Sequence, residues 1–372
     1  MPRPKISAKK AAAKKPAASK VAKKAAPKKK AAPTKRIARP KPTLAPAAIA
    51  APQTSAALEN AARIALRDCM KVSAGETVAI ITDENKRNIG VAIWNVAKEL
   101  GAEATLVEII PRSRNGEEPP APVAALMAAS SVVLCPTTKS VTHTESRREA
   151  CKRGARIATL PGITEEMMTR CLSADYNAIA ARSRRLSEIL QTGNEVHVTS
   201  PAGTDIKLLR GDRYPKPDTG LYHNAGESGN LPAGETFFAP IEGSAQGKIV
   251  FEAAVAGIGK LQNNIHITVR DGYAVEITGG ADASKLNALV DAVGKEGRNI
   301  AELGIGTNDK AQITGVILED EKVMGTVHLA LGDNKSMGGN VAVSSHLDGL
   351  ILKPTVRLDG RVIMEAGTLL LA

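Results

Sequence analysis

The sequence is poor in aromatic residues and cysteines: its 372 residues include one Trp, four Tyr, three Phe and four Cys. No two cysteines have the C-x-x-C spacing of a zinc or redox site. Cys69, Cys135, Cys151 and Cys171 are far apart, each in an apolar or helical setting. This pattern predicts small buried side chains in a reducing compartment, and it offers no cysteine nucleophile beside a base.

Several common motifs are also missing. No G-x-G-x-x-G opens a helix, and neither a P-loop nor a G-x-S-x-G element occurs, so a dinucleotide site, a phosphate loop and a serine hydrolase have no support. The chain has no apolar stretch long enough to cross a membrane, and its first residues lack the apolar core of a secretory signal. We therefore expect a cytoplasmic protein without membrane contact.

Acidic residues are absent from residues 1–52, which hold sixteen of the 50 Lys and Arg. The rest of the chain has 34 basic against 38 acidic residues, a net charge of −4, so the formal charge of +12 comes from this segment. Residues 1–54 are predicted to be a disordered tail rich in Lys, Ala and Pro. Residues 1–52 either bind nucleic acid or another polyanion nonspecifically, without aromatic stacking, or form a solvated extension.

From residue 55 the chain has the composition of a globular protein. Short buried strands such as TVAIITD and SVVLCPT alternate with helical segments up to Gln191, which predicts a parallel sheet covered by helices over residues 55–193. Residues 194–372 instead contain hairpin patterns, including NNIHITVRDGYAVEITGG with its Asp271–Gly272 turn. The predicted fold class is thus α/β, with a parallel-sheet domain followed by a β-rich α+β metal-binding domain.

The stretch from Ala301 to Gly349 contains the side chains best suited to chemistry. His346 and Asp348 are two positions apart, so on a strand they face the same side. His328 lies in the apolar run MGTVHLALG, which predicts a second strand. Two strand histidines with carboxylates near them are how proteins bind divalent metals. The alternative is that each His satisfies a buried polar group while the acids face water.

Five motifs strengthen the metal hypothesis, because their order resembles that of the M29 metallo-aminopeptidases, the aminopeptidase T/S family. The motifs are GETFFAP at Gly234–Pro240, AELGIG at Ala301–Gly306, GTVHLALG at Gly325–Gly332, GGN at Gly338–Asn340 and HLDG at His346–Gly349. The similarity is strongest over residues 230–360 and does not reach the first fifty residues. It implies a homodimer that removes N-terminal residues from short peptides with water activated by two metal ions, chosen from Zn, Co, Mn and Mg.

The resemblance also implies which side chains hold the metals. They are Glu235, Glu302, His328, His346 and Asp348, with Glu321 as a further, less certainly aligned ligand. Glu302 matches the glutamate that bridges the two ions and is also a candidate catalytic residue. Lys335 stands where these peptidases have a catalytic tyrosine, so it is a second candidate catalytic residue that either stabilises an oxyanion or indicates a different reaction.

Two other functions stay open. The 2,5-dihydroxypyridine dioxygenases are relatives of these peptidases and share the closing His-x-Asp element, which they use with a further His to bind one Fe(II) for O2 chemistry. Here that further position is Glu302, and Glu235 is retained, which favours the peptidase. The third possibility is a nucleic-acid-associated protein that uses its basic tail. The sequence analysis therefore predicts a metallo-aminopeptidase, with the dioxygenase as the main alternative.

Overall fold

A computed structural model describes residues 54–371 of the chain. The predictions for the tail, residues 1–52 for binding and 1–54 for disorder, fall almost entirely on residues outside this range. Within the described range no helix combines the length and apolar character that a membrane span requires.

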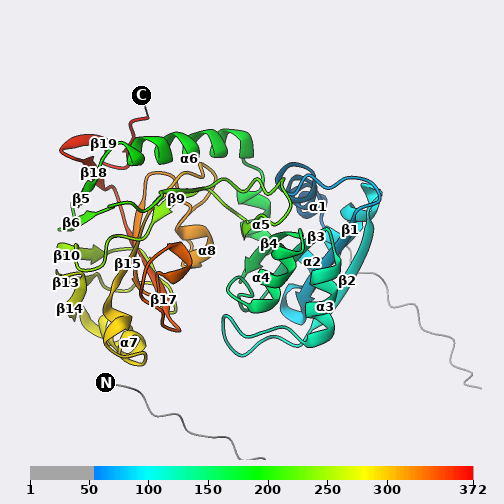
Figure 1. Cartoon of the computed structure of the whole chain (residues 1–372), viewed down its shortest axis with the longest axis horizontal. Coiled ribbons are helices and arrows are strands. Elements are labelled where there is room, and N and C mark those ends of the chain that lie inside the picture. Colours follow the sequence, from blue (N-terminus) through cyan, green and yellow to red (C-terminus); the bar gives the residue numbers. More distant parts are fainter. Residues whose placement is uncertain (1–53, 372) are drawn as a thin grey trace, which may run out of the picture. The chain divides into compact units, whose positions relative to one another are not determined.

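The first part of the described chain forms the parallel sheet that the sequence predicts (Figure 1). Its five strands are ordered β2-β1-β3-β4-β8, and every neighbouring pair is parallel. The strands are β1 (Thr77–Asp83), β2 (Glu103–Ile109), β3 (Val132–Thr137), β4 (Arg156–Pro161) and β8 (Ser228–Asn230). Strands β1, β3 and β4 are buried along most of their length, as expected for a sheet covered on both faces.

Helices connect these strands, and several begin at a residue whose side chain caps the first turn. Ser55, Thr144, Thr164 and Asp175 each accept a hydrogen bond from a backbone N–H two or three residues later, which satisfies a donor that the helix leaves free. The helices are α1 (Ala56–Ile64), the π-helical η1 (Ala65–Cys69), the 3-10 turn η2 (Glu84–Lys86), α2 (Arg87–Glu99), α3 (Ala121–Ala129), α4 (Glu145–Lys152), α5 (Glu165–Cys171) and α6 (Tyr176–Gln191).

Two antiparallel sheets make up most of the remaining chain. The eight-stranded sheet has the order β14-β13-β10-β6-β5-β18-β19-β20, and the seven-stranded sheet has the order β12-β11-β17-β16-β15-β9-β7. Their strands are β5 (Glu195–Thr199), β6 (Asp205–Leu209), β7 (Lys216–Asp218), β9 (Glu235–Phe238), β10 (Gln246–Phe251), β11 (Ala254–Val255), β12 (Gly259–Lys260), β13 (Ile265–Arg270), β14 (Tyr273–Thr278), β15 (Ile300–Gly306), β16 (Val327–Gly332), β17 (His346–Ile351), β18 (Thr355–Leu358), β19 (Arg361–Glu365) and β20 (Thr368–Leu369). The predicted mixed α/β fold class is confirmed.

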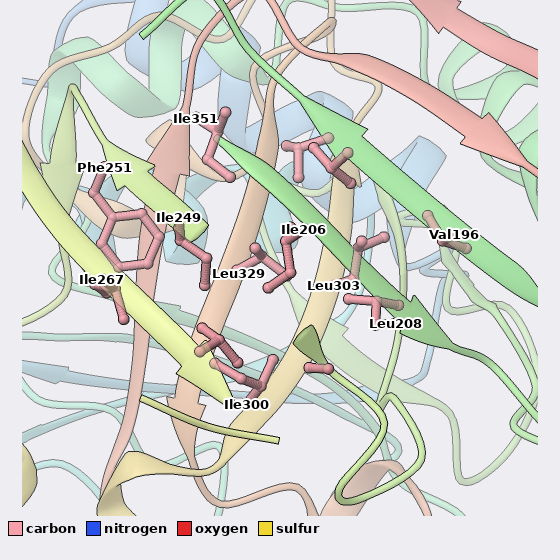
Figure 2. Close-up of a cluster of buried hydrophobic side chains, with 14 of the residues drawn as sticks. Val196, Ile206, Leu208, Ile249, Phe251, Ile267, Ile300, Leu303, Leu329 and Ile351 are labelled. Atoms are coloured by element: carbon pink, nitrogen blue, oxygen red, sulfur yellow. The ribbon is translucent and has the colours of Figure 1, made fainter. Parts of the chain in front are cut away.

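An apolar core joins the inner faces of these two sheets (Figure 2). Strands β5, β6, β10 and β13 contribute residues such as Ile206, Ile249 and Phe251, and strands β15 to β17 contribute Leu303 and Leu329. Burying one such side chain stabilises the fold by about 1.5–3 kcal/mol. Because strand side chains alternate, this core fixes which residues of β15, β16 and β17 face the opposite side of their sheet.

Short helices fill the connections of this region: α7 (Gly280–Asp291), α8 (Ile317–Asp320), and the 3-10 turns η3 (Lys295–Arg298) and η4 (Lys335–Met337). The sequence pattern predicts α7 over Ser284–Gly294, but the helix begins four residues earlier. Its first turn is held by Asp282, which accepts a hydrogen bond from the N–H of Gln262 at 2.8 Å. That contact links segments that are distant in sequence, so local propensity did not indicate it.

The segment Leu221–Gly234 corrects another expectation. The sequence suggests an irregular loop that lines a cavity or crosses to a partner, with Tyr222 and His223 free to bind substrate. In the structure β8 joins the parallel sheet, and the buried Tyr222 hydroxyl donates to the carbonyl of Asn230 at 2.7 Å. His223 Nε2 lies 2.8 Å from the carbonyl of Asp68, so both side chains are engaged within the fold.

An ion pair connects α5 to α8 and gives a stability prediction. Both guanidinium contacts of Arg170 with Glu319 are short, at 2.8 and 2.7 Å, and the Glu319 side chain is fully buried. Glu319→Ala is expected to lower the free energy of unfolding by roughly 3 kcal/mol, because it leaves a largely buried cation without a partner. Glu188→Ala, which removes an exposed pair with Arg185, is the control, with an expected loss under about 0.5 kcal/mol. Equal urea midpoints for the two variants would contradict the prediction.

Candidate metal centre

Five of the predicted ligands lie on one face of the seven-stranded sheet. They come from four adjacent strands, β9, β15, β16 and β17. The strand registers place the following residues opposite one another: Glu235 and Gly306, Gly304 and His328, Glu302 and Ala330, Ala330 and Asp348, and Gly332 and His346. Paired residues share a face, so these strands direct all five ligands away from the apolar core.

Several positions beside the ligands on this face are glycine or alanine, namely Gly304, Gly306, Ala330 and Gly332, which leaves room for the polar side chains. Gly304 shows why this matters, because a Cβ atom there would lie 1.9 Å from Nε2 of His328. The run VHLALG thus has two alternating roles: Val327, Leu329 and Leu331 fill the core, while His328 faces the polar side. The sequence periodicity encodes this division.

One group of candidate ligands consists of Glu302, His346 and Asp348. His346 Nε2 lies 3.1 Å from a Glu302 oxygen and 3.3 Å from Asp348 Oδ1. The other ring nitrogen, Nδ1, donates a hydrogen bond to the carbonyl of Asp333 at 2.7 Å. In neutral His346 this bond places the Nε2 lone pair toward the two carboxylates, as the outer hydrogen bond of a metal-binding histidine does.

A second group consists of Glu235, Glu302 and His328, so Glu302 belongs to both groups. His328 Nε2 lies 3.1 Å from Glu235 Oε2 and 3.4 Å from Glu302 Oε1. Among the described residues, neither ring nitrogen of His328 nor Glu235 Oε2 has a hydrogen-bond partner with good geometry, although all three atoms are buried. Such atoms carry a large desolvation cost unless a proton or cation joins them.

The carboxylates raise the pKa values of the two imidazoles, those of His328 and His346. Burial disfavours the charged form of His346, but Asp348 and Glu302 outweigh it and hold the pKa of the ring well above its usual range. Burial likewise opposes charge on His328, and Glu235 and Glu302 raise its pKa well above the usual range. Without a metal, protons on the two rings therefore compensate the negative charge of the carboxylates. A metal ion that binds here must displace these protons.

Lys322 is a buried charged residue at the edge of the candidate ligands that the sequence does not reveal. Its side chain is only 2% exposed, and Nζ lies 2.6 Å from Glu235 Oε1 and 2.7 Å from Glu321 Oε1. A third carboxylate, that of Asp218, is 3.8 Å away. Burial opposes the charge, but these acids raise the pKa of Lys322 well above its usual range. No motif marks this lysine, because its acidic partners Asp218 and Glu235 come from distant strands.

Glu321 borders the cluster but belongs to neither group of candidate ligands. Burial raises its pKa to about 8, against the favourable charge of Lys322, and the charges of Glu235 and Asp348 add to the rise. Its carboxylate accepts a hydrogen bond from Nζ of Lys322. The predicted role of Glu321 as a metal ligand therefore stays a prediction.

Lys335 occupies a different environment from the predicted ligands. It is exposed at the start of η4, and within residues 54–371 its side chain makes no hydrogen bond or ion pair with the five ligands. The charge of His346 also acts on His143, an exposed residue that the sequence does not single out. Surrounding protein lowers the pKa of its imidazole, as does the charge of His346, while Asp333 raises it.

The strand patterns around His197 and His266 suggest two structural histidines outside the centre, without an acid in the same strand register. His266 is exposed on β13. His197, however, has an acidic neighbour, because Nε2 lies 2.7 Å from Oδ1 of Asp205 on the paired strand β6. The hairpin register creates this contact, which a search along the same strand does not reveal.

Comparisons with known proteins point to one family. The family described as NicX, 2,5-dihydroxypyridine 5,6-dioxygenase, matches residues 57–371. The 2,5-dihydroxypyridine 5,6-dioxygenase of Pseudomonas putida strain KT2440 is 24% identical over 258 residues, covering 66% of this chain and 73% of the relative. The solved structure of the 2,5-dihydroxypyridine dioxygenase from Pseudomonas putida KT2440 has a TM-score of 0.73 at 20% identity, covering 84% of this chain and 96% of that one. Wild-type AmpT from Thermus thermophilus has a TM-score of 0.63 at 18% identity, covering 84% and 99%. At these identities the two structures show a shared fold.

Proposed function

Because the chain belongs to the 2,5-dihydroxypyridine 5,6-dioxygenase family, we propose that it is a metal-dependent dioxygenase that opens a dihydroxylated pyridine-type ring. The observation that carries this proposal is the family match over residues 57–371, which includes the whole candidate metal centre. The curated relative of that name supports the same reaction class.

This family assignment corrects the main prediction from the sequence. The ordered motifs were interpreted as those of a metallo-aminopeptidase, but the family and the curated relative are both dioxygenases. The prediction of a peptide hydrolase acting on short peptides is therefore wrong, and the alternative reading has the better support. Glu302 and Glu235 misled the interpretation, because their retention favours the peptidase over the dioxygenase when the motifs alone are compared. The predicted homodimer stays a prediction.

The donor set is chemically suited to a divalent metal. Glu302, His346 and Asp348 offer two carboxylates and one imidazole, a combination that fits Fe(II), Mn or Zn. The second imidazole, that of His328, falls in the other group, so the described geometry is not a set of two histidines and one carboxylate. Bound Fe(II) supplies the one-electron chemistry that O2 requires to react with an aromatic ring.

Residues of the chain orient these ligands and leave space beside them. The carbonyl of Asp333 holds the His346 ring in one orientation, and the β16–β17 register sets Asp348 beside it. The small residues Gly304 and Ala330 leave space on the same face.

The direct test uses 2,5-dihydroxypyridine and Fe(II)-loaded protein under air. We expect one O2 consumed for each ring opened, loss of the aromatic absorbance, and both atoms of labelled O2 in a product whose bond between carbons 5 and 6 is broken. Pyridine with a single hydroxyl group at position 2 is the control substrate. Absence of O2 uptake with fully loaded, folded protein would refute the proposed reaction.

A further inference from the structure

The buried ammonium of Lys322 lies next to one of the two groups of candidate ligands, so the two groups differ in their local charge. It lies against Oε1 of Glu235 and Oε1 of Glu321, at 2.6 and 2.7 Å, with Asp218 at 3.8 Å. Lys322 and Asp218 are themselves buried, and the hydroxyl oxygen of Tyr222 lies 3.0 Å from Oδ1 of Asp218. This ammonium is therefore held by residues from several segments and cannot leave as a surface lysine does.

The charge of Lys322 weakens the Glu235 group as a metal position. A metal ion prefers carboxylates whose negative charge is not already compensated, and it is repelled by a fixed positive charge a few ångströms away in a buried site. Glu235 Oε1 is already bound by the ammonium. Its other oxygen lies 3.1 Å from Nε2 of the buried His328 ring.

The Glu302, His346 and Asp348 group lacks such a fixed cation. Within residues 54–371 no Lys or Arg pairs with Glu302 or Asp348, whose only cationic neighbours are histidines. The His346 side chain is 30% exposed, whereas that of His328 is 1% exposed, so solvent and metal reach the cluster from this side. The lack of a Lys or Arg partner and the exposure of His346 both favour this group as the position of the metal ion.

We propose that the Lys322 ammonium takes the place of a second metal ion beside Glu235. The cluster then binds one divalent metal ion, between Glu302, His346 and Asp348. The inference rests on the metal site of the proposed function but not on the ring-opening reaction. On this inference Lys322 determines how many metal ions the chain binds, and it does so through Glu235 rather than by contact with substrate.

Metal stoichiometry tests the inference without any activity assay. The full chain is loaded with Mn2+ alone, dialysed, and measured for bound manganese and by electron paramagnetic resonance. We expect one ion per chain and the spectrum of isolated Mn2+ in the wild type. Lys322→Met is expected to bind a second ion at least about 100-fold more tightly than the wild type does, with spin coupling between the two ions, because a repelling charge is gone. Lys86→Met, a half-buried lysine outside the cluster, should behave as the wild type.

The outcomes separate this inference from the proposed function. Two tightly bound ions in the wild type, or a folded Lys322→Met that still binds only one, overturn the inference alone. A wild type that binds no metal overturns the proposed metal site as well. If Lys322→Met does not fold, Glu235→Gln decides: retention of one ion supports the inference, and loss of that ion places the metal on the Glu235 side and overturns it.

Discussion

Asp348→Asn is expected to lower metal affinity at least about 100-fold and to reduce metal-dependent activity about 1000-fold, because it removes a charged ligand without changing the size of the side chain. Asp348 lies 3.3 Å from His346 Nε2, on the same face of β17, and is only 10% exposed.

Stability measurements distinguish loss of a ligand from loss of the fold. A metal ion that binds only the folded state raises the melting temperature. We expect this rise in the wild type and its absence in Asp348→Asn, while the metal-free proteins melt within a few degrees of each other. Asp291→Asn, which alters an exposed pair with Arg298, is the matched control and should keep the full rise. An Asp348→Asn protein stabilised as strongly by metal as the wild type would rule out Asp348 as a ligand.

The sequence predicts those parts of the fold that depend on local periodicity. Strand β1 coincides with the run TVAIITD, and helix α3 coincides with the helix that the pattern predicts over Ala121–Ala129. The pairing of His346 with Asp348 also follows from local spacing, because residues two apart on a strand share a face.

Features that depend on distant segments were not predictable in this way. Lys322 and Glu235 are 87 positions apart, and only the pairing of β7 with β9 brings Asp218 beside them. Strand β8 consists of Ser228, Gly229 and Asn230, which have low β-propensity, so its place in the parallel sheet arises from pairing with β4. The choice between hydrolase and dioxygenase failed for a similar reason, since the same ligand types serve both chemistries.

The last prediction concerns Gly304, the glycine beneath the His328 ring. A Cβ atom at this position would lie 1.9 Å from Nε2 and 2.2 Å from Cε1 of His328, far inside van der Waals contact. Gly304 lies in the middle of β15, directly opposite His328 in register, so neither backbone strand can move away without breaking its ladder. Gly304→Ala is therefore expected to destabilise the protein by about 1–3 kcal/mol, the usual effect of overpacking a rigid interior.

A double-mutant cycle tests whether the His328 ring causes this effect. His328→Ala removes the ring, so the added methyl group of Gly304→Ala then enters the space it vacates. We expect the double variant to be more stable than the sum of the single effects predicts, by at least about 1 kcal/mol, as contacting residues do. The free energies of unfolding come from urea titrations of the metal-free proteins, which keeps metal binding out of the comparison. Strictly additive effects would mean that the clash is relieved elsewhere and that Gly304 does not position His328.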